Sequence, residues 1–155
     1  MHEIRIEHPD QPDVIGLLQA RDEYSATLYP PESNHALDLA GLLAPAVTFL
    51  VARRDGVAVA CGAVVRGSPN EGEIKSMWVE PGHRGRGVGR AMLAAVERTA
   101  QAQGVAILRL ETGIRQPEAL RMYRAAGYRE TGPFGAYRPD PLSVFMEKRL
   151  EEAKG

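Results

Sequence analysis

The sequence predicts a mixed α/β domain whose elements follow one another in the order βααβββαβαββ. Three observations support this fold class. Helical and strand periodicities alternate along the chain, clusters of Gly and Pro separate them, and one glycine-rich loop joins a strand directly to a long helix. Because the 155 residues show no repeat or linker, we expect a single domain over residues 1–155.

Two patterns define the elements of the first half of the chain. Apolar residues recur at helical spacing after residue 13, and the pair Pro30-Pro31 stops this helix. Two later apolar runs are separated by the hairpin signal Arg53-Arg54-Asp55-Gly56. The expected elements are a strand at 3–8, helices at 13–28 and 36–43, and strands at 47–52 and 57–65.

The second half centres on a strand, a glycine loop and a long helix. A turn at 68–72 leads into the strand, and Gly104 is a natural stop for the helix. A shorter helix begins with Pro117 at its first position and ends before Gly127. The expected elements are strands at 73–79, 106–110, 128–131 and 143–150, and helices at 88–103 and 117–126.

Composition narrows the range of partners. The chain has 19 Lys and Arg against 20 Asp and Glu, a net charge of −1, which argues against a nucleic-acid or anionic-membrane surface. We expect a cytoplasmic protein, because the sequence shows neither a long apolar span nor a signal-peptide pattern. The lone Cys61, in an apolar run, is expected to be buried rather than nucleophilic, and no His or Cys spacing predicts a metal site.

The loop before the long helix has the properties of a phosphate-binding loop. Gly85, Gly87 and Gly89 let the backbone approach a diphosphate, whose charge is favoured at the positive end of the helix dipole. A P-loop would need Lys and then Ser or Thr after the last glycine, and a dinucleotide loop would need glycine where Arg90 stands. The neighbouring arginines fit either a solvated face or an anion site.

The residues Arg84-Gly85-Arg86-Gly87-Val88-Gly89 match the pattern R-x-x-G-x-G. This pattern resembles the acetyl-CoA signature of the GNAT superfamily of N-acetyltransferases. The segment 118–128 also resembles the family's A-x-x-x-Y-x-x-x-G-[FY] motif. One departure is Gln116, which stands where the family often has Asn. The resemblance implies a GNAT fold, a strongly twisted mixed sheet of about six to seven strands flanked by about four helices.

The resemblance also implies a function. The protein is expected to transfer the acetyl group of acetyl-CoA to a primary amine, by direct transfer in a ternary complex and without a metal. Near-neutral charge favours a small-molecule acceptor over a protein or peptide amine. A homodimer is the oligomer that the family suggests. The residues expected to bind acetyl-CoA are Met77, Trp78, Val79, Arg84, Gly85, Arg86, Gly87, Val88, Gly89, Arg90, Gln116 and Tyr123.

Two side chains are candidates for the proton transfers that amine acetylation requires. Tyr123 matches the family's tyrosine and is the expected acid, although it could be a packing residue on its helix. Glu73 stands where some members carry a base that works through water, although it could form a surface pair with Lys75. The resemblance implies a backbone role for Met77, Trp78 and Val79, with the side chains of Met77 and Trp78 in the core.

The identity of the acceptor is not encoded in any motif. The resemblance places its site among the first two helices and the last loop, where candidates are Tyr24, Tyr29, Glu32, His35, Phe134 and Tyr137. Two rival functions are an acyl-CoA sensor without turnover and another kind of nucleotide-binding α/β protein. Release of CoA with a library of amines would distinguish the enzyme from both rivals.

Overall fold

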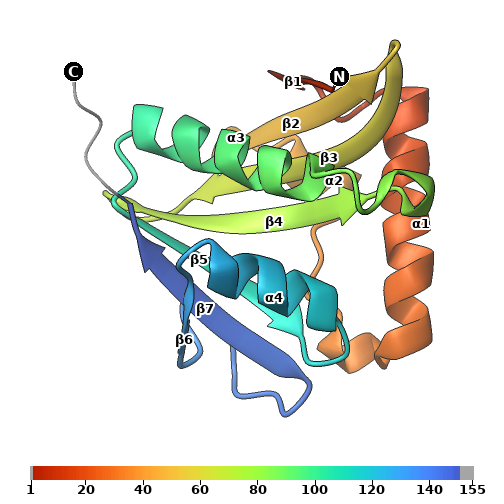
Figure 1. Ribbon diagram of the computed structural model, residues 1–155. Helices are drawn as coiled ribbons and strands as arrows, with labels where there is room; N and C mark the ends of the chain where they lie inside the picture. The colour runs from red at the N-terminus through yellow and green to blue at the C-terminus, as the bar shows by residue number, and fades with distance from the viewer. Residues whose placement is uncertain (1, 151–155) are drawn as a thin grey trace.

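A computed structural model describes residues 2–150, so residues 1 and 151–155 of the predicted domain lie outside the described part. One seven-stranded sheet has the order β1-β2-β3-β4-β5-β7-β6 (Figure 1). β4 and β5 are parallel, and every other neighbouring pair is antiparallel, so the mixed sheet predicted from the sequence is confirmed. The strands are β1 (Glu3–Ile6), β2 (Val47–Arg54), β3 (Val57–Arg66), β4 (Glu71–Val79), β5 (Ile107–Gly113), β6 (Arg129–Thr131) and β7 (Ser143–Arg149).

Four helices cover the two faces of the sheet. α3 and α4 pack on one face, where Met92 and Leu120 join a core with Leu108 of β5. α1 and α2 pack on the other face, where Val14 and Leu42 join a second core. The helices are α1 (Pro12–Leu28), α2 (Leu39–Leu42), α3 (Val88–Ala102) and α4 (Pro117–Ala125), with 3₁₀ turns at Pro31–Ser33 and Pro81–His83.

Each expected helix and strand is present, with shifts at the ends. The helix expected at 36–43 is only α2, because the Asp38 carboxylate accepts a hydrogen bond from the Gly41 amide at 2.8 Å and so caps the helix at residue 39. β4 begins at Glu71 rather than residue 73, since Gly72 pairs with Leu108 inside the sheet. Cys61 is fully buried as expected, and burial raises the pKa of its thiol to about 12.

β4 contains the irregularity that shapes the centre of the protein. Its pairing with β3 shifts register between Cys61 and Ala63, so Ser76 and Met77 both lie opposite Gly62. Ser76 has a φ of 59°, in the left-handed region, as the extra residue of this bulge. Because a bulge reverses the alternation of side chains, Trp78 lies on the same face as Lys75, toward α1.

β4 and β5 pair over only part of their length. The pairs run from Glu71 with Ile107 to Glu73 with Arg109, and none joins the strands beyond them within residues 2–150. The two strands then part toward the end of the sheet where α3 and α4 begin (Figure 1). The carboxyl-terminal half of β4 therefore has backbone groups on one edge that no neighbouring strand satisfies.

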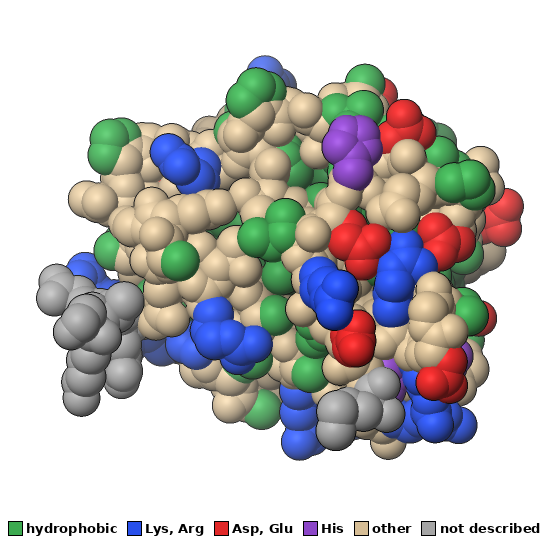
Figure 2. All heavy atoms as spheres, turned by 90° about the horizontal axis from the view of Figure 1, so that it is seen from above, with side chains coloured by type: hydrophobic (Ala, Val, Ile, Leu, Met, Phe, Trp, Pro, Cys, Tyr) green, Lys and Arg blue, Asp and Glu red, His purple; other side chains and the backbone are tan. Residues whose placement is uncertain are grey.

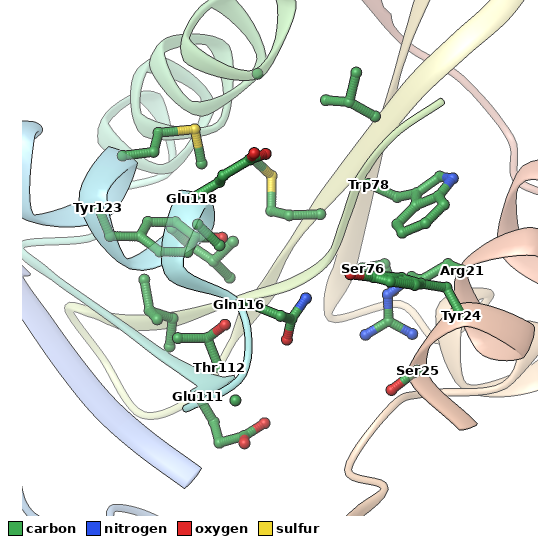
Figure 3. A pocket seen from close by; sticks show the side chains of 18 of the residues that line it. Arg21, Tyr24, Ser25, Ser76, Trp78, Glu111, Thr112, Gln116, Glu118 and Tyr123 are labelled. Atoms are coloured by element: carbon green, nitrogen blue, oxygen red, sulfur yellow. The ribbon is translucent and has the colours of Figure 1, made fainter. Parts of the chain in front are cut away.

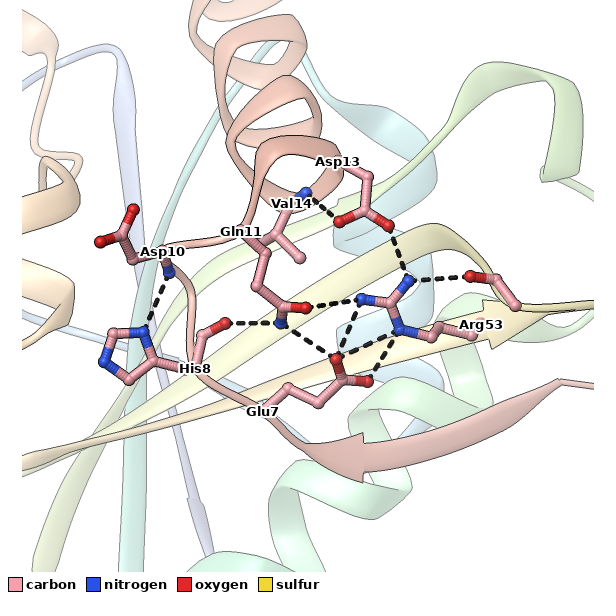
Figure 4. A network of polar contacts seen from close by, with 8 residues as sticks. Glu7, His8, Asp10, Gln11, Asp13, Val14 and Arg53 are labelled. Atoms are coloured by element: carbon pink, nitrogen blue, oxygen red, sulfur yellow. Dashed lines mark hydrogen bonds and ion pairs between the residues drawn. The ribbon is translucent and has the colours of Figure 1, made fainter.

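Arg53 connects the amino-terminal segment to the sheet through hydrogen bonds and ion pairs (Figure 4). Its guanidinium donates to the Glu7 carboxylate at 3.0 Å, to Asp13 at 2.6 Å and to Gln11 at 3.2 Å. Hydrogen bonds from Arg53 lower the pKa of both Glu7 and Asp13. The network joins β2 to the start of α1.

We expect Arg53→Gln to lower the free energy of unfolding by about 1–2 kcal/mol near neutral pH, since Glu7 and Asp13 lose a charged donor and Asp13 is half exposed. Because both carboxyl pKa values are lowered in the folded state, this stabilisation is present above their unfolded pKa and is lost as the pH falls through the folded pKa. Urea unfolding near pH 7 and at about pH 3 should show a smaller difference at the acidic pH. The exposed Arg66, changed to Gln, is the control; equal losses for Arg53→Gln at both pH values would contradict this account.

The face of the molecule seen from above has no large patch of one charge sign among the described residues (Figure 2). Figure 2 shows acidic and basic side chains interspersed there, in keeping with the net charge of −1. In the described part of the chain, no helix has the length and apolar character that crossing a bilayer requires.

Candidate active site

A cavity of about 980 Å³ lies where β4 and β5 part. It extends from the amino-terminal end of α3, between the two strands, to the carboxyl-terminal half of α1 (Figure 3). Its volume is in the range of sites for cofactors and other small ligands. The gap in the sheet and the cavity are therefore one feature.

The end of the cavity at α3 is suited to a diphosphate. Gly85 and Gly87 both have a φ of 78°, and a Cβ at either position would meet nothing within 4 Å, so the backbone there is open to a ligand. No side chain caps α3 at Gly87, and the first helical bond runs from the Ala91 amide to the Gly87 carbonyl. The three preceding amides thus have no partner within the helix and can donate to an anion.

Arg84 and Arg90 line this end of the cavity, whereas Arg86 does not. The Arg84 guanidinium lies 4.8 Å from the centre of the Trp78 ring and donates to the Val79 carbonyl at 3.1 Å. Its side chain is therefore held along β4.

The unpaired edge of β4 presents two amides to the cavity. The Glu80 amide donates to the Val59 carbonyl at 2.9 Å across the β3 ladder. Because hydrogen-bonded pairs alternate in an antiparallel ladder, Trp78 also bonds toward β3, and the amides of Met77 and Val79 point away from it. The bond from Arg84 to the Val79 carbonyl agrees with this direction. Among the three backbone positions predicted, Met77 and Val79 are thus better placed than Trp78.

Tyr123 projects from α4 into the middle of the cavity (Figure 3). The residue is only 5% exposed, and its ring packs edge-on against Tyr128 at 5.6 Å. Within residues 2–150 no side chain or backbone group hydrogen-bonds to its hydroxyl, which is left for a ligand. Burial raises the pKa of Tyr123, so its phenol keeps the proton at neutral pH.

Glu73, the base predicted from the sequence, is not among the residues that line the cavity. Its carboxylate accepts a hydrogen bond from the Tyr137 hydroxyl at 2.5 Å and lies 3.2 Å from the Lys75 ammonium. Lys75 does line the cavity and also donates to the His35 carbonyl at 2.8 Å. Glu73 therefore lies outside the cavity, where its carboxylate positions the Lys75 ammonium and the Tyr137 hydroxyl.

Glu111 is a second carboxylate near the parted strands, and no sequence motif marks it. It lies on β5 just beyond the last pair with β4, and its side chain lines the cavity (Figure 3). Burial raises the pKa of its carboxyl group, while Ser143, His35 and Lys75 oppose that rise. A partly buried carboxylate with a raised pKa is a stronger proton acceptor than a solvated one.

Tyr29, at the carboxyl terminus of α1, lines the far end of the cavity. The Tyr29 hydroxyl accepts a hydrogen bond from the Arg115 amide at 3.0 Å and lies 3.4 Å from the Gln116 side-chain oxygen. It lies so close to Gly113 that a Cβ there would be 1.8 Å from the hydroxyl oxygen. The α1 end and the loop after β5 therefore meet only because residue 113 has no side chain.

Most of the predicted ligand-binding residues come together around the cavity. Glu73 and Arg86 do not line it, and neither do Glu32, Phe134 and Tyr137 among the acceptor candidates. Residues missed from the sequence are Arg21, Ser76, Glu111 and Arg115. Arg21 could have been found, because a charged residue stands at an apolar position of a helical stripe. No local pattern marks the other three.

Comparison with known proteins identifies the same family as the sequence motifs. The model of the acetyltransferase (GNAT) family matches residues 14–128. The chain is 48% identical over 145 residues to the IAA acetyltransferase of Azospirillum brasilense, covering 93% of this chain and 95% of the relative. It is 35% identical over 152 residues to the uncharacterized N-acetyltransferase YsnE of Bacillus subtilis strain 168, covering 97% and 100%.

A solved structure agrees with these relatives. A Klebsiella pneumoniae protein assigned as an acyl-CoA N-acyltransferase superposes with a TM-score of 0.83 and 38% identity, covering 97% of this chain and 99% of that one. The family model, the relatives and the fold show that this chain is an acyltransferase and belongs to the GNAT family of N-acetyltransferases.

Proposed function

We propose that this enzyme transfers the acetyl group of acetyl-CoA to the primary amine of a small molecule, by direct transfer within a ternary complex. The observation that carries the proposal is the cavity between β4 and β5, which joins the α3 amides to Tyr123 in one continuous space. The GNAT family uses acetyl-CoA, which supplies an activated thioester. No nucleophilic side chain is offered by Cys61, because it is fully buried outside the cavity.

The residues present fit acetyl-CoA along the length of the cavity. The unpaired amides at the start of α3, with Arg84 and Arg90, would hold its diphosphate. The free edge of β4 would pair with the amide groups of its pantetheine arm, as an added strand does. Gln116 lies beside this path and offers a side-chain amide in place of the family's Asn.

The reaction needs a base, an oxyanion donor and an acid. The Glu111 carboxylate is placed to accept the proton of the amine, because it lines the cavity and Glu73 does not. The amides of Met77 and Val79 are placed to donate to the carbonyl oxygen as negative charge develops. Tyr123 is placed to donate its proton to the departing thiolate.

A screen of acceptors tests this function directly. Release of free CoA from acetyl-CoA should be measured with amino acids, polyamines, aminoglycosides and peptides, and the acetylated product identified by mass spectrometry. The name of the Azospirillum relative adds IAA to the compounds worth testing. Binding of CoA without turnover on any acceptor would instead favour a sensor, and turnover only on peptides would favour a protein substrate.

Replacing Gly87 with Val tests the diphosphate site. The variant places a branched side chain at a φ of 78° and fills the open space before α3, so CoA should bind at least about tenfold more weakly in calorimetry. Gly104→Val is the matched control, because Gly104 has a φ of 83° and open space but does not line the cavity. Both variants should lose similar thermal stability, and only Gly87→Val should lose CoA affinity. Equal CoA affinity in the two folded variants would remove the diphosphate from this loop.

A further inference from the structure

Arg21 stands on the face of α1 that packs against the sheet. Val14, Leu17 and Tyr24 occupy the same stripe at helical spacing, with Val14 and Leu17 buried and Tyr24 packed on Trp78 at 5.6 Å. At this inward position an apolar side chain would be expected. A charged group there loses solvation and needs a partner of opposite charge.

The partner that the protein supplies is weak. The Arg21 guanidinium lies 3.2 Å from the Asp22 carboxylate, its one hydrogen-bonding partner within residues 2–150, and the Asp22 side chain is 58% exposed. A guanidinium has five N–H donors, so most of those on Arg21 are left for a ligand. Figure 3 shows the Arg21 side chain directed into the cavity.

Arg21 and Tyr123, the proposed acid, line the same cavity. Burial raises the pKa of Tyr123, and the positive charge of Arg21 opposes that rise, which places the two groups within electrostatic reach of each other. The Ser76 hydroxyl lines the same cavity, is buried and has no partner among the residues described. The space between α1 and Tyr123 is therefore polar on both sides.

The charges at the acceptor end select against a cationic acceptor. Lys75 is balanced by Glu73 at 3.2 Å, whereas the Arg115 guanidinium donates to the neutral Leu28 carbonyl and Arg21 has only the exposed Asp22 carboxylate beside it, so positive charge is in excess here. Glu111 is the carboxylate that faces the same space. A polyamine would bring further positive charge to Arg21, and a molecule with both an amine and an anionic group would match both side chains.

We propose that the acceptor carries an anionic group, of which a carboxylate is the simplest, in addition to its amine, and that Arg21 binds this group while the amine lies at Glu111. Amino acids are the corresponding substrate class. A guanidinium binds a carboxylate through two parallel hydrogen bonds, so the contact would orient the amine as well as hold it. This inference rests on the proposed function, because it assigns the acceptor of that reaction.

The test compares acceptors that differ only in the anionic group. α-, β- and γ-amino acids and their amides should be assayed in pairs for release of CoA by the wild-type enzyme, Arg21→Gln and Arg21→Lys. The amide has the less basic amine, so a preference for the acid cannot arise from a larger neutral fraction. Wild type should prefer the best acid over its amide by about tenfold or more in kcat/KM.

Arg21→Gln should abolish this preference, mainly through a higher KM for the acid, and lower kcat/KM for the acid about tenfold more than for its amide. Arg21→Lys should retain part of it, because it keeps the charge without the two-bond geometry. Arg129→Gln is the control, since Arg129 is exposed on β6 and away from the cavity. Equal use of acids and amides by the wild type would overturn the inference and leave the proposed function intact. If Arg21→Gln slowed the reactions of acids and amides equally, that result would also overturn the inference. If no amine caused release of CoA from acetyl-CoA, the proposed function itself would be contradicted.

Discussion

Replacing Glu111 with Gln is expected to lower the rate of acetyl transfer by on the order of 10²–10⁴, the usual cost of removing a general base. The substitution keeps the shape of the side chain and removes the proton acceptor. Its effect should appear in single-turnover measurements with saturating acetyl-CoA, and the affinity for CoA should change little. Because burial raises the pKa of Glu111, the wild-type rate should fall as the pH drops through that raised value, and Glu111→Gln should lose this acidic limb.

Glu73→Gln is the matched variant, because Glu73 is the other candidate base and lies on the neighbouring strand. Its carboxylate is engaged by Tyr137 and Lys75, so its loss should lower stability and retain most of the rate. If Glu73→Gln loses the acidic limb and Glu111→Gln keeps it, the base is Glu73, as the sequence predicted. The pair of variants therefore decides between the two carboxylates.

Tyr123→Phe is expected to reduce turnover by on the order of 10²-fold with little change in CoA affinity, because we propose the phenol as the proton donor for the thiolate. The ring is 5% exposed and packed on Tyr128, so the variant keeps nearly all of its packing. A single-turnover assay under conditions in which chemistry limits the rate gives the clearest measurement. A folded variant with the parent's rate would make Tyr123 a packing residue.

Tyr128→Phe is the control for this experiment. Its hydroxyl donates to the Glu97 carboxylate at 2.7 Å and does not line the cavity. The control should lose about 1–2 kcal/mol of stability, as expected for a hydrogen bond to a charged group, and keep its rate of transfer. Loss of rate in both variants would indicate that the packing of α4, rather than a proton, is what matters.

Local patterns in the sequence were sufficient to predict the elements of the fold. Val88, Met92 and Val96 recur at helical spacing in the sequence, and all three side chains are buried on one face of α3. The loop before α3 could also be predicted from the sequence, because a backbone with positive φ favours glycine for steric reasons that depend on that residue alone. These features depend on residues close together in the chain.

The features that create the site depend on contacts between distant segments. The strand pattern of β4 continues through Ser76, so no local sequence pattern predicts the bulge or the point at which β4 and β5 stop pairing. Glu111 follows a buried strand as many surface residues do, and it faces the cavity only because β5 has separated from β4. For Arg86 the reverse holds, because the loop contributes its backbone and turns this side chain away from the cavity.

The bulge in β4 makes the active site depend on a count of residues rather than on a particular side chain. Because Ser76 is the extra residue opposite Gly62, losing one codon there would restore regular alternation along the strand. Met77, Trp78 and Val79 would keep their faces and their pairing with β3, but the strand would lose the bend that a bulge produces and could continue alongside β5. During evolution this strand can therefore accept many substitutions, whereas the loss of this one residue is expected to close the gap beside β5 and to leave the amides of Met77 and Val79, the proposed oxyanion donors, without access to the cavity.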